Sequence, residues 1–588
     1  MRLLTRAAYA TLFLASLAIA HGDDESMDIE RAMSMDIHAT ASAVTPTASV
    51  SHNAQNEGPT SYFSYGQHSS TILAHITLMT LGWCFILPAA VILSIGRSRL
   101  ALPSQFLFLV FNAIGLLFGI IYNSQTPDLY ENNAHHKIGW IVTLVISAQV
   151  VLALIFAYAG RGESKQPQSR CFSRATFLPV ATDEHECPCS TRAMHEYCWS
   201  RDSDQATEPS SSIRSPLSPS CEYQAEFDGF VKPEELHPKI SSLRGWFYKS
   251  IVDRFLLKCV RGRVSNRALR ILNSVYNVID RIILPFGFIA TTTGAVTYGG
   301  IFHGIEIFNG LAHFIKGGIF FWYGVLTLGR FIGAWADLGW AWNKKPPACV
   351  VGWKAKVPSG EFVESFVIWL YGVTNVFLEH LAGKGKEWSA TDMEHVSISI
   401  MFFGGGLVGM LFESQRIRDA LNNTLLQSPT YDSGDEKWQP PESQGVPLNP
   451  MPALIILLLG MIMGSHHQDS MTSTMVHKQW GHMLVGFAIA RGMTYVLLFL
   501  RPPTSYLPAR PPTEIVAGFC LMSGGLIFML SARQVIEAME FFELDAMFTF
   551  TVGMGFTAFV MSLVVLTIAI KAWAVKRERT QEQRLSSR

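Results

Sequence analysis

Long apolar stretches separated by shorter polar turns run along most of this sequence. They lie at about 71–95, 103–122, 137–159, 282–302, 308–333, 361–379, 394–413, 451–465, 482–500, 514–532 and 546–572. A helix needs roughly twenty consecutive apolar residues to cross a bilayer. The pattern therefore predicts an all-α fold, a polytopic transmembrane helical bundle of about eleven spans. The short 451–465 stretch could instead be re-entrant, and the glycine-rich turn near 303–307 leaves the division between its two neighbours open.

The amino terminus has the pattern of a secretory signal peptide. Arg2 and Arg6 precede a short apolar run, and Ala18-Ile19-Ala20 fits the small-residue cleavage rule. Removal of residues 1–20 would place the new terminus, at His21, outside the cytosol. An uncleaved membrane anchor is the alternative interpretation.

Charged turns predict the orientation of the spans, because short cytosolic loops are enriched in Lys and Arg. With the amino terminus outside, the basic turns fall inside: Arg97, Arg99, Lys344, Lys345, Lys354, Lys356, Arg416, Arg418, Arg501 and Arg510. The basic tail 576–588 is also cytosolic in this arrangement, so we expect the amino terminus outside and the carboxyl terminus inside.

Polar segments divide the remaining chain. We expect a disordered outer tail at 21–68, a three-helix module at 69–160, a partly disordered cytosolic loop at 161–274, and a domain of about eight helices at 275–575. Alternating basic and bulky apolar residues at 243–270 indicate either an amphipathic helix on the cytosolic leaflet or an ordinary connecting helix. In the same loop, His185, Cys187, Cys189, His195 and Cys198 have an irregular spacing that could hold zinc.

Composition agrees with a membrane class of protein. Apolar residues make up 49% of the 588 residues, charged residues only 16%, and the formal net charge is zero. The chain thus has neither a basic field nor a motif for nucleic acid, and its expected partner is the lipid bilayer. A signal peptide followed by many spans predicts a multi-pass protein of the secretory pathway, in the plasma membrane, the vacuole or another endomembrane.

Histidines are unevenly distributed in this topology. Of 18 histidines, only His185, His195 and His237 are predicted to be cytosolic. The others fall in outer loops or near the outer ends of spans, where a small-molecule or metal-ion ligand could reach them. Imidazoles at such positions are typical of ligand or proton sites, although an imidazole also tolerates the polar interface without a ligand.

One histidine group favours haem. His75 lies in the first span, and His135 and His136 open the third. The second span returns between them, so both groups lie at the same depth and could ligate one iron axially.

Residues 71–159 resemble part of the ascorbate-reducible, six-helix transmembrane cytochrome b family. The resemblance rests on His75, Met79, Trp83, Pro88, Arg97, His136 and Gly139. It implies one haem b with His75 and His136 as axial ligands, and His135 is the competing choice. The second span departs from the family, because Asn112 stands about where a histidine is expected. A second haem site is therefore absent, which puts transmembrane electron transfer in doubt.

Four groups of imidazoles and carboxylates favour a transition metal on the outer face. The candidate ligands are His303, Glu306, His313, Glu379, His380, Asp392, Glu394, His395, His466, His467, His477 and His482. The fourth group comprises Glu537, Glu540, Glu543 and Asp545. Mixed imidazole and carboxylate ligands suit zinc or iron, and the neighbouring methionines favour copper. The alternative is a polar network that fixes the helix ends without a metal.

Blocks in the second half resemble a fungal family of Ytp-type integral membrane proteins. These blocks are GGIFHGIEIFNGLAHFIKGG, VTNVFLEHLAGKGKEWSATDMEHVSISIMFFGGGLVGM and WGHMLVGFAIARGMTYVLL. The resemblance covers roughly 70–160 and 275–575 and implies the same two-part architecture.

Three functions follow as hypotheses. The first is single-haem electron transfer or metal reduction, and the second is binding or sensing of copper, zinc or iron without redox chemistry. The third is transport along a polar path that includes Lys316, Arg330, Glu361, Glu364, Arg491 and Arg533. Most of these six lie near span ends, where snorkelling to the interface would also explain them.

Overall fold

A computed structural model describes residues 61–159, 266–304, 306–378, 390–425, 441–466 and 468–586. Every regular element within these ranges is helical, so the predicted all-α fold is confirmed. The signal peptide, most of the outer tail, and the loop 160–265 with its possible zinc motif lie outside the described residues. Predictions about those segments stay predictions, as does the orientation of the chain in the membrane.

The amino-terminal helices form one group. They are α3 (Ser69–Thr80), η1 (Leu81–Ile86), α4 (Leu87–Ile95), α5 (Ala101–Gln125), α6 (Ala134–Ala159) and α9 (Asn266–Gly299). The π-helical η1 joins α3 and α4 into one continuous span. Their shared core contains Leu87, Phe108, Ile146 and Ile283, which come from four different helices.

The end of the predicted outer tail differs from expectation, because residues 62–65 form the short helix α2 (Tyr62–Tyr65). Ser61 caps this helix, and the rings of Tyr62 and Phe63 lie about 6.0 Å from those of Tyr122 and Tyr298. Aromatic packing fixes a segment whose polar composition had predicted disorder.

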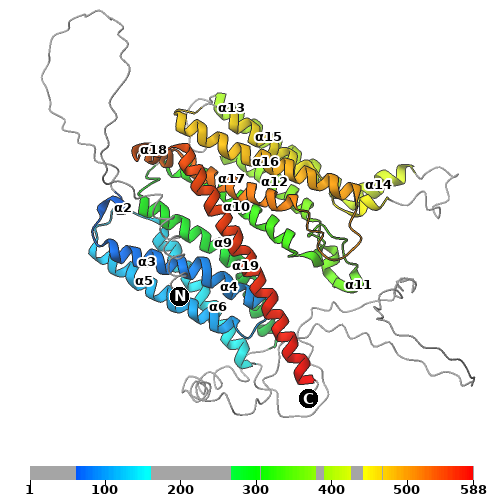
Figure 1. Cartoon of the computed structure of the whole chain (residues 1–588), viewed down its shortest axis with the longest axis horizontal. Coiled ribbons are helices and arrows are strands. Elements are labelled where there is room, and N and C mark those ends of the chain that lie inside the picture. Colours follow the sequence, from blue (N-terminus) through cyan, green and yellow to red (C-terminus); the bar gives the residue numbers. More distant parts are fainter. Residues whose placement is uncertain are drawn as a thin grey trace, which may run out of the picture. The chain divides into compact units, whose positions relative to one another are not determined.

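The carboxyl-terminal helices form a second, larger group. They are α10 (Glu306–Ile332), α12 (Gly360–Leu378), α13 (Ala390–Glu413), α15 (Met451–Ser465), α16 (Met471–Leu500), α17 (Thr513–Leu530) and α19 (Ala546–Ser586). Short helices connect them: η3 (Ala336–Leu338), α11 (Ala348–Val351), η4 (Gly352–Lys356), α14 (Gln415–Leu425), η6 (Glu442–Gly445) and α18 (Arg533–Phe541). Helix α17 packs against α10, α16 and α19, and α16 also packs along α15 (Figure 1).

Each of the predicted apolar stretches coincides with a helix. Among the described residues, nine helices are long and apolar enough to cross a membrane. The other two are α15, which has 15 residues, and α12, which carries Glu361 and Glu364. The turn near 303–307 does separate two helices, because α9 ends at Gly299 and α10 begins at Glu306.

Within the described residues, the chain divides into two compact units. One comprises residues up to Val150 together with Ile279–Arg588, and therefore holds both groups of helices. The other, Val151–Val278, contains the end of α6 and the beginning of α9, where Phe156 and Tyr276 meet edge to face.

Glycines allow α10 and α17 to approach closely. A Cβ atom on Gly317 would lie 2.5 Å from the carbonyl oxygen of Gly525, and one on Gly324 would lie 2.9 Å from that of Gly518. Small residues at a crossing are the usual means of tight helix packing in membranes. Here they allow α10, which carries the buried Arg330, to pack directly against α17.

Gly317→Val should lower the melting temperature of the purified protein, because a side chain there would collide with the backbone of α17. Overpacking of this kind costs about 1–3 kcal/mol. Circular dichroism in detergent measures the shift, and Gly492→Val on α16 is the matched control, because a Cβ at Gly492 meets nothing within 4 Å. Equal melting temperatures for both variants would contradict the packing described here.

Candidate functional site

Of the three histidines predicted as haem ligands, His75 and His135 are neighbours, whereas His136 is not part of this pair. The rings of His75 on α3 and His135 on α6 lie 6.3 Å apart, nearly perpendicular. Nδ1 of His75 bonds the carbonyl oxygen of Gly115 at 2.8 Å, and Nδ1 of His135 bonds that of Ala290 at 3.0 Å. Each imidazole is thus fixed through Nδ1 by a neighbouring helix, which assigns Nε2 as the nitrogen for any ligand.

His136 lies elsewhere. It is exposed, and its ring centre is 6.5 Å from that of Trp140 on the same helix. The resemblance implied His136 as the second ligand, whereas the geometry brings the alternative, His135, opposite His75. The 3.6-residue helical period decides this, because two consecutive residues cannot face the same neighbour.

Asn112 occupies the middle of α5, where a second haem would have needed a histidine. It is buried, it accepts a hydrogen bond from Trp83 Nε1 at 3.0 Å, and it donates one to Thr143 Oγ1 at 3.3 Å. Its side chain therefore joins three helices.

The predicted outer metal ligands separate into pairs. His313 and His477 face each other at 6.3 Å between ring centres, and His466 Nδ1 lies 3.3 Å from Glu394 Oε2. His303 stacks on Tyr130 with ring centres 4.3 Å apart.

Within the described ranges, no three His, Cys, Asp or Glu side chains gather closely enough to hold one metal ion. Glu306, Asp392, His395 and His482 therefore belong to no such group there, and Glu379, His380 and His467 lie outside these ranges. The predicted ligand groups that contain Glu379, His380 and His467 are thus only partly described.

The most highly charged site lies instead inside the carboxyl-terminal helices. Arg330 on α10 exposes 1% of its side chain, and Arg491 on α16 exposes none. A buried guanidinium is costly unless its charge is paired and its donors are bonded. The expectation that these residues snorkel is therefore wrong for both arginines.

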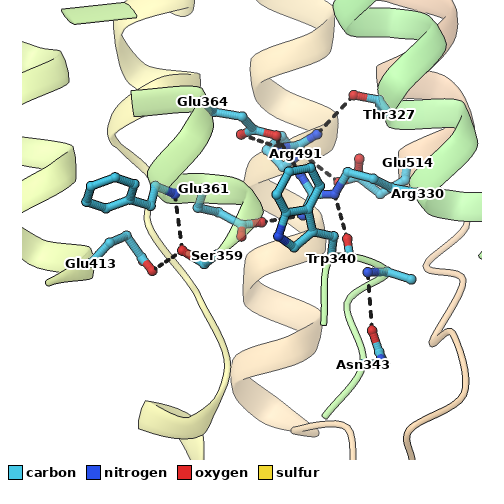
Figure 2. A network of polar contacts seen from close by, with 12 residues as sticks. Thr327, Arg330, Trp340, Asn343, Ser359, Glu361, Glu364, Glu413, Arg491 and Glu514 are labelled. Atoms are coloured by element: carbon cyan, nitrogen blue, oxygen red, sulfur yellow. Dashed lines mark hydrogen bonds and ion pairs between the residues drawn. The ribbon is translucent and has the colours of Figure 1, made fainter. Parts of the chain in front are cut away.

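Three glutamates surround the two arginines (Figure 2). Arg330 donates to Glu361 Oε1 at 2.6 Å and to Glu364 Oε1 at 2.5 Å. Arg491 donates to Glu364 Oε2 at 3.1 Å, and its Nε lies 2.8 Å from Glu514 Oε1. We call these five residues the charge network.

Glu364 is the central residue of the charge network, because it accepts from both arginines. Glu361 and Glu364 are three positions apart on α12, so they share a face of that helix. The network thereby connects α10, α12, α16 and α17.

A returning segment, 333–359, covers one side of the network. The ring of Trp342 lies 4.3 Å from the guanidinium carbon of Arg330 and 5.4 Å from that of Arg491, within cation–π range. Arg330 Nε also donates to the carbonyl oxygen of Trp340 at 2.6 Å. Gly360 allows this fit, since a Cβ there would lie 3.0 Å from the Arg330 guanidinium carbon.

Polar contacts hold the returning segment in place. Asn343 Nδ2 donates to the carbonyl oxygens of Ala336 and Tyr506, both at 2.8 Å. Lys345 Nζ donates to the carbonyl oxygen of Val357 at 2.6 Å, and partial burial lowers the pKa of this ammonium group. These hydrogen bonds fix the returning segment as one wall of the site.

A cavity of about 310 Å³ adjoins the charge network. Its wall is mainly apolar and comes from α10, α12, α13 and α15, with Phe528 of α17. Glu364 and Tyr323 belong both to this wall and to the contacts of the two arginines. Lys316, Asn375 and His395 also line the wall, and Asn375 lies eleven residues beyond Glu364 along α12. The cavity thus has a polar group at each end and an apolar middle.

Sequence reasoning named four members of the charge network and missed Glu514. This residue follows Pro511-Pro512-Thr513 at the start of an apolar stretch, which favours an ordinary first-turn acid. Its complete burial, and the role of Trp342, depend on which helices meet. The remaining residues of the predicted path separate from the network: Lys316 lines the cavity, and exposed Arg533 pairs with Glu537 on its own helix.

Two family models match the chain. Residues 286–572 match the model described as "Protein YTP1-like, C-terminal", and residues 56–159 match a domain of unknown function. No solved structure matches significantly.

Three curated fungal proteins are similar. The chain is 33% identical to "Uncharacterized membrane protein C3B8.06" of Schizosaccharomyces pombe, over 87% of this chain and 96% of that protein. It is 37% identical to "Uncharacterized membrane protein YCR061W" of Saccharomyces cerevisiae over 53% of this chain and 50% of that protein. It is 24% identical to "Protein YTP1" of the same yeast over 47% and 50%, respectively.

Arg491→Gln should lower the stability of the folded protein strongly, because it removes one of the two buried cations and leaves Glu364 with a single arginine partner. Breaking a buried ion pair by removing one member costs about 3–5 kcal/mol. Thermal unfolding of purified variants measures the loss, and Arg533→Gln, which breaks an exposed pair, should leave the melting temperature unchanged. Similar shifts for both variants would show that the charge network does not stabilise the fold.

Proposed function

Since this chain belongs to the family of YTP1-like membrane proteins, we propose that it is a multi-pass membrane carrier that binds a small, mainly apolar solute among its carboxyl-terminal helices. One observation carries the proposal: a cavity of about 310 Å³ is lined by Glu364 of the buried charge network and by Tyr323, which accepts a hydrogen bond from Arg491. Buried ionisable groups are expensive in membrane helices and mark pathways for substrates or ions. Cavities of roughly 300–1,000 Å³ are the size range of small-molecule sites.

The side chains that line the cavity indicate what kind of molecule it would bind. Ile368, Phe402 and Leu459 offer an apolar surface to its body. A hydrogen-bond acceptor or negative charge suits the end with Lys316, whereas a donor suits the carboxylate of Glu364. An elongated amphipathic molecule with a polar group at each end satisfies both conditions.

A purely stabilising network is the competing interpretation. Stability alone does not favour it, because well-packed apolar residues often replace a buried ion pair without loss. The adjoining cavity also favours a ligand, since it reaches the surface beside exposed Ile319 and Val367 and so offers an entry to the charge network.

Native mass spectrometry of the protein purified in detergent should detect a bound small molecule that filling the cavity removes. Leu459→Trp and Ile398→Trp, on two different helices, each insert an indole into the space and should lose the adduct. Ile489→Trp on α16, at a position 58% exposed, is the matched control and should retain it. Absence of an adduct from the wild type, or its persistence in both filled variants that keep the wild-type melting temperature, would overturn the proposal.

A second proposal concerns the amino-terminal module, where His75 and His135 could hold one haem b or a single transition-metal ion. The observation that favours it is the 6.3 Å spacing of two imidazoles, each anchored through Nδ1. Two imidazoles that share one metal at about 2.0–2.1 Å per nitrogen have ring centres about 6 Å apart. Hydrogen bonds from Nδ1 to backbone carbonyls are the usual support for such ligands. A haem would supply one-electron chemistry, and these two side chains would set its axial ligation.

The two histidines at the start of α6 give a sharp test of this second proposal. The purified protein should show a Soret band, or one equivalent of metal, that His75→Ala and His135→Ala abolish. His136→Ala should keep the signal, because His136 is exposed and its ring lies near Trp140 on its own helix. Loss of the signal in His136→Ala with retention in His135→Ala would reverse the assignment, and absence of both signals in the wild type would refute it.

A further inference from the structure

The charge network contains an odd number of ionisable groups. Arg330 and Arg491 are cations, and Glu361, Glu364 and Glu514 are acids, each residue exposed by 7% or less. If all three acids were ionised, one negative charge would remain without compensation. An unpaired charge in such surroundings costs several kcal/mol, so one further positive charge is required.

The neighbours of the network do not supply that charge. From α10 come Arg330, Tyr323 and Thr327, from α16 come Arg491 and Tyr495, and from the returning segment comes Trp342. On α13, Glu413 accepts from Ser359 at 2.7 Å and adds a further acid to the surroundings. Within the described residues, every cation paired with a network carboxylate is one of the two arginines.

The three acids differ in how well the structure stabilises their anions. Glu364 accepts from both arginines, and Glu361 accepts from Arg330 through one oxygen. Neither oxygen of Glu514 receives a hydrogen bond, although Arg491 Nε is close, because the N–H direction is unfavourable. Glu514 is therefore the acid whose two oxygens accept the fewest hydrogen bonds in the network.

Buried polar atoms without hydrogen-bond partners around the same site also favour a bound proton. Both oxygens of Glu514, Oε2 of Glu361, the hydroxyl of Tyr495 and Nε1 of Trp342 are buried without a hydrogen-bond partner. Buried polar atoms of native proteins are almost always paired, so such a group calls for an explanation. A carboxylic acid changes this balance, because it donates as well as accepts.

We propose that the charge network is a proton-binding site, in which one proton from bulk water converts Glu514 to the neutral acid, with Glu361 as the second carboxyl able to receive it. The site is then electrically balanced, with two cations and two anions. Its link to the cavity passes through Glu364, which lines the cavity and bonds both arginines. The link to the cavity rests on the proposed carrier function, in which the proton would be the coupling ion. The proton site itself does not depend on that function.

Infrared spectroscopy of the protein in lipid nanodiscs at neutral pH tests this site directly. The wild type should show a carbonyl band from a protonated carboxyl group, and Glu514→Gln should lose one such band. Glu361→Gln should lose it as well, because removal of that negative charge allows Glu514 to ionise. Glu537→Gln, at an exposed pair, is the control and should keep the band.

Charge-conserving variants identify which residue holds the proton. They also provide a test if a glutamine variant fails to fold. Glu514→Asp should shift the position of the band, because an aspartic acid then absorbs, whereas Glu361→Asp should leave the position unchanged. A band that stays unchanged in all four variants of Glu514 and Glu361 would overturn the proposal. A band that appears only after sodium is replaced by choline would also overturn it, in favour of sodium as the compensating cation.

The result is separable from that of the solute experiment. The infrared measurement reads the proton whether or not a small molecule co-purifies. A missing adduct with an intact acid band would refute the carrier and leave the proton site, and the reverse outcome would refute the proton site alone.

Discussion

Neutralisation of two buried arginines is the constraint on which the carboxyl-terminal helices depend. Neither Arg330 nor Arg491 reaches solvent, so their charges and donors must be satisfied inside the protein. The partners come from α12 and α17 and from the backbone of the returning segment. Helices that are far apart in the sequence are thereby held together by one set of polar contacts, in surroundings where apolar contacts to lipid offer little discrimination.

This polar connection requires close helix approach. Gly317, Gly324, Gly518 and Gly525 remove side chains from the crossing of α10 and α17, and Gly360 removes one from the site of the Arg330 guanidinium. The same packing leaves an unfilled space beside Glu364, bounded by four helices that do not close on one another. Charge pairing, glycine contacts and the cavity are therefore parts of one arrangement.

The amino-terminal module is organised around polar contacts between its helices. His75, His135 and Asn112 are each bonded to a neighbouring helix, and the buried Asp280 accepts from Ser94 and Gln149. Polar residues of this kind fix which helices are neighbours. The haem or metal site proposed at the imidazole pair would give this half of the chain a chemistry separate from that of the charge network.

The sequence by itself determined the class of the protein and the positions of its helices. Apolar runs of sufficient length have one low-energy structure in a bilayer, so each predicted stretch is a helix, α15 included. The acids at Glu361 and Glu364 were also recognisable, because ionisable residues inside an apolar stretch are rare and indicate a functional position.

The partners of those residues were decided by the tertiary structure alone. Glu514 has the sequence context of a first-turn acid, and only the packing of α17 against α10 and α16 buries it beside Arg491. His135 and His136 are equivalent in the sequence, and the rotation of α6 selects the first. Helical periodicity is a local property, whereas contact between helices depends on their rotation and crossing, which residues distant in the chain fix together.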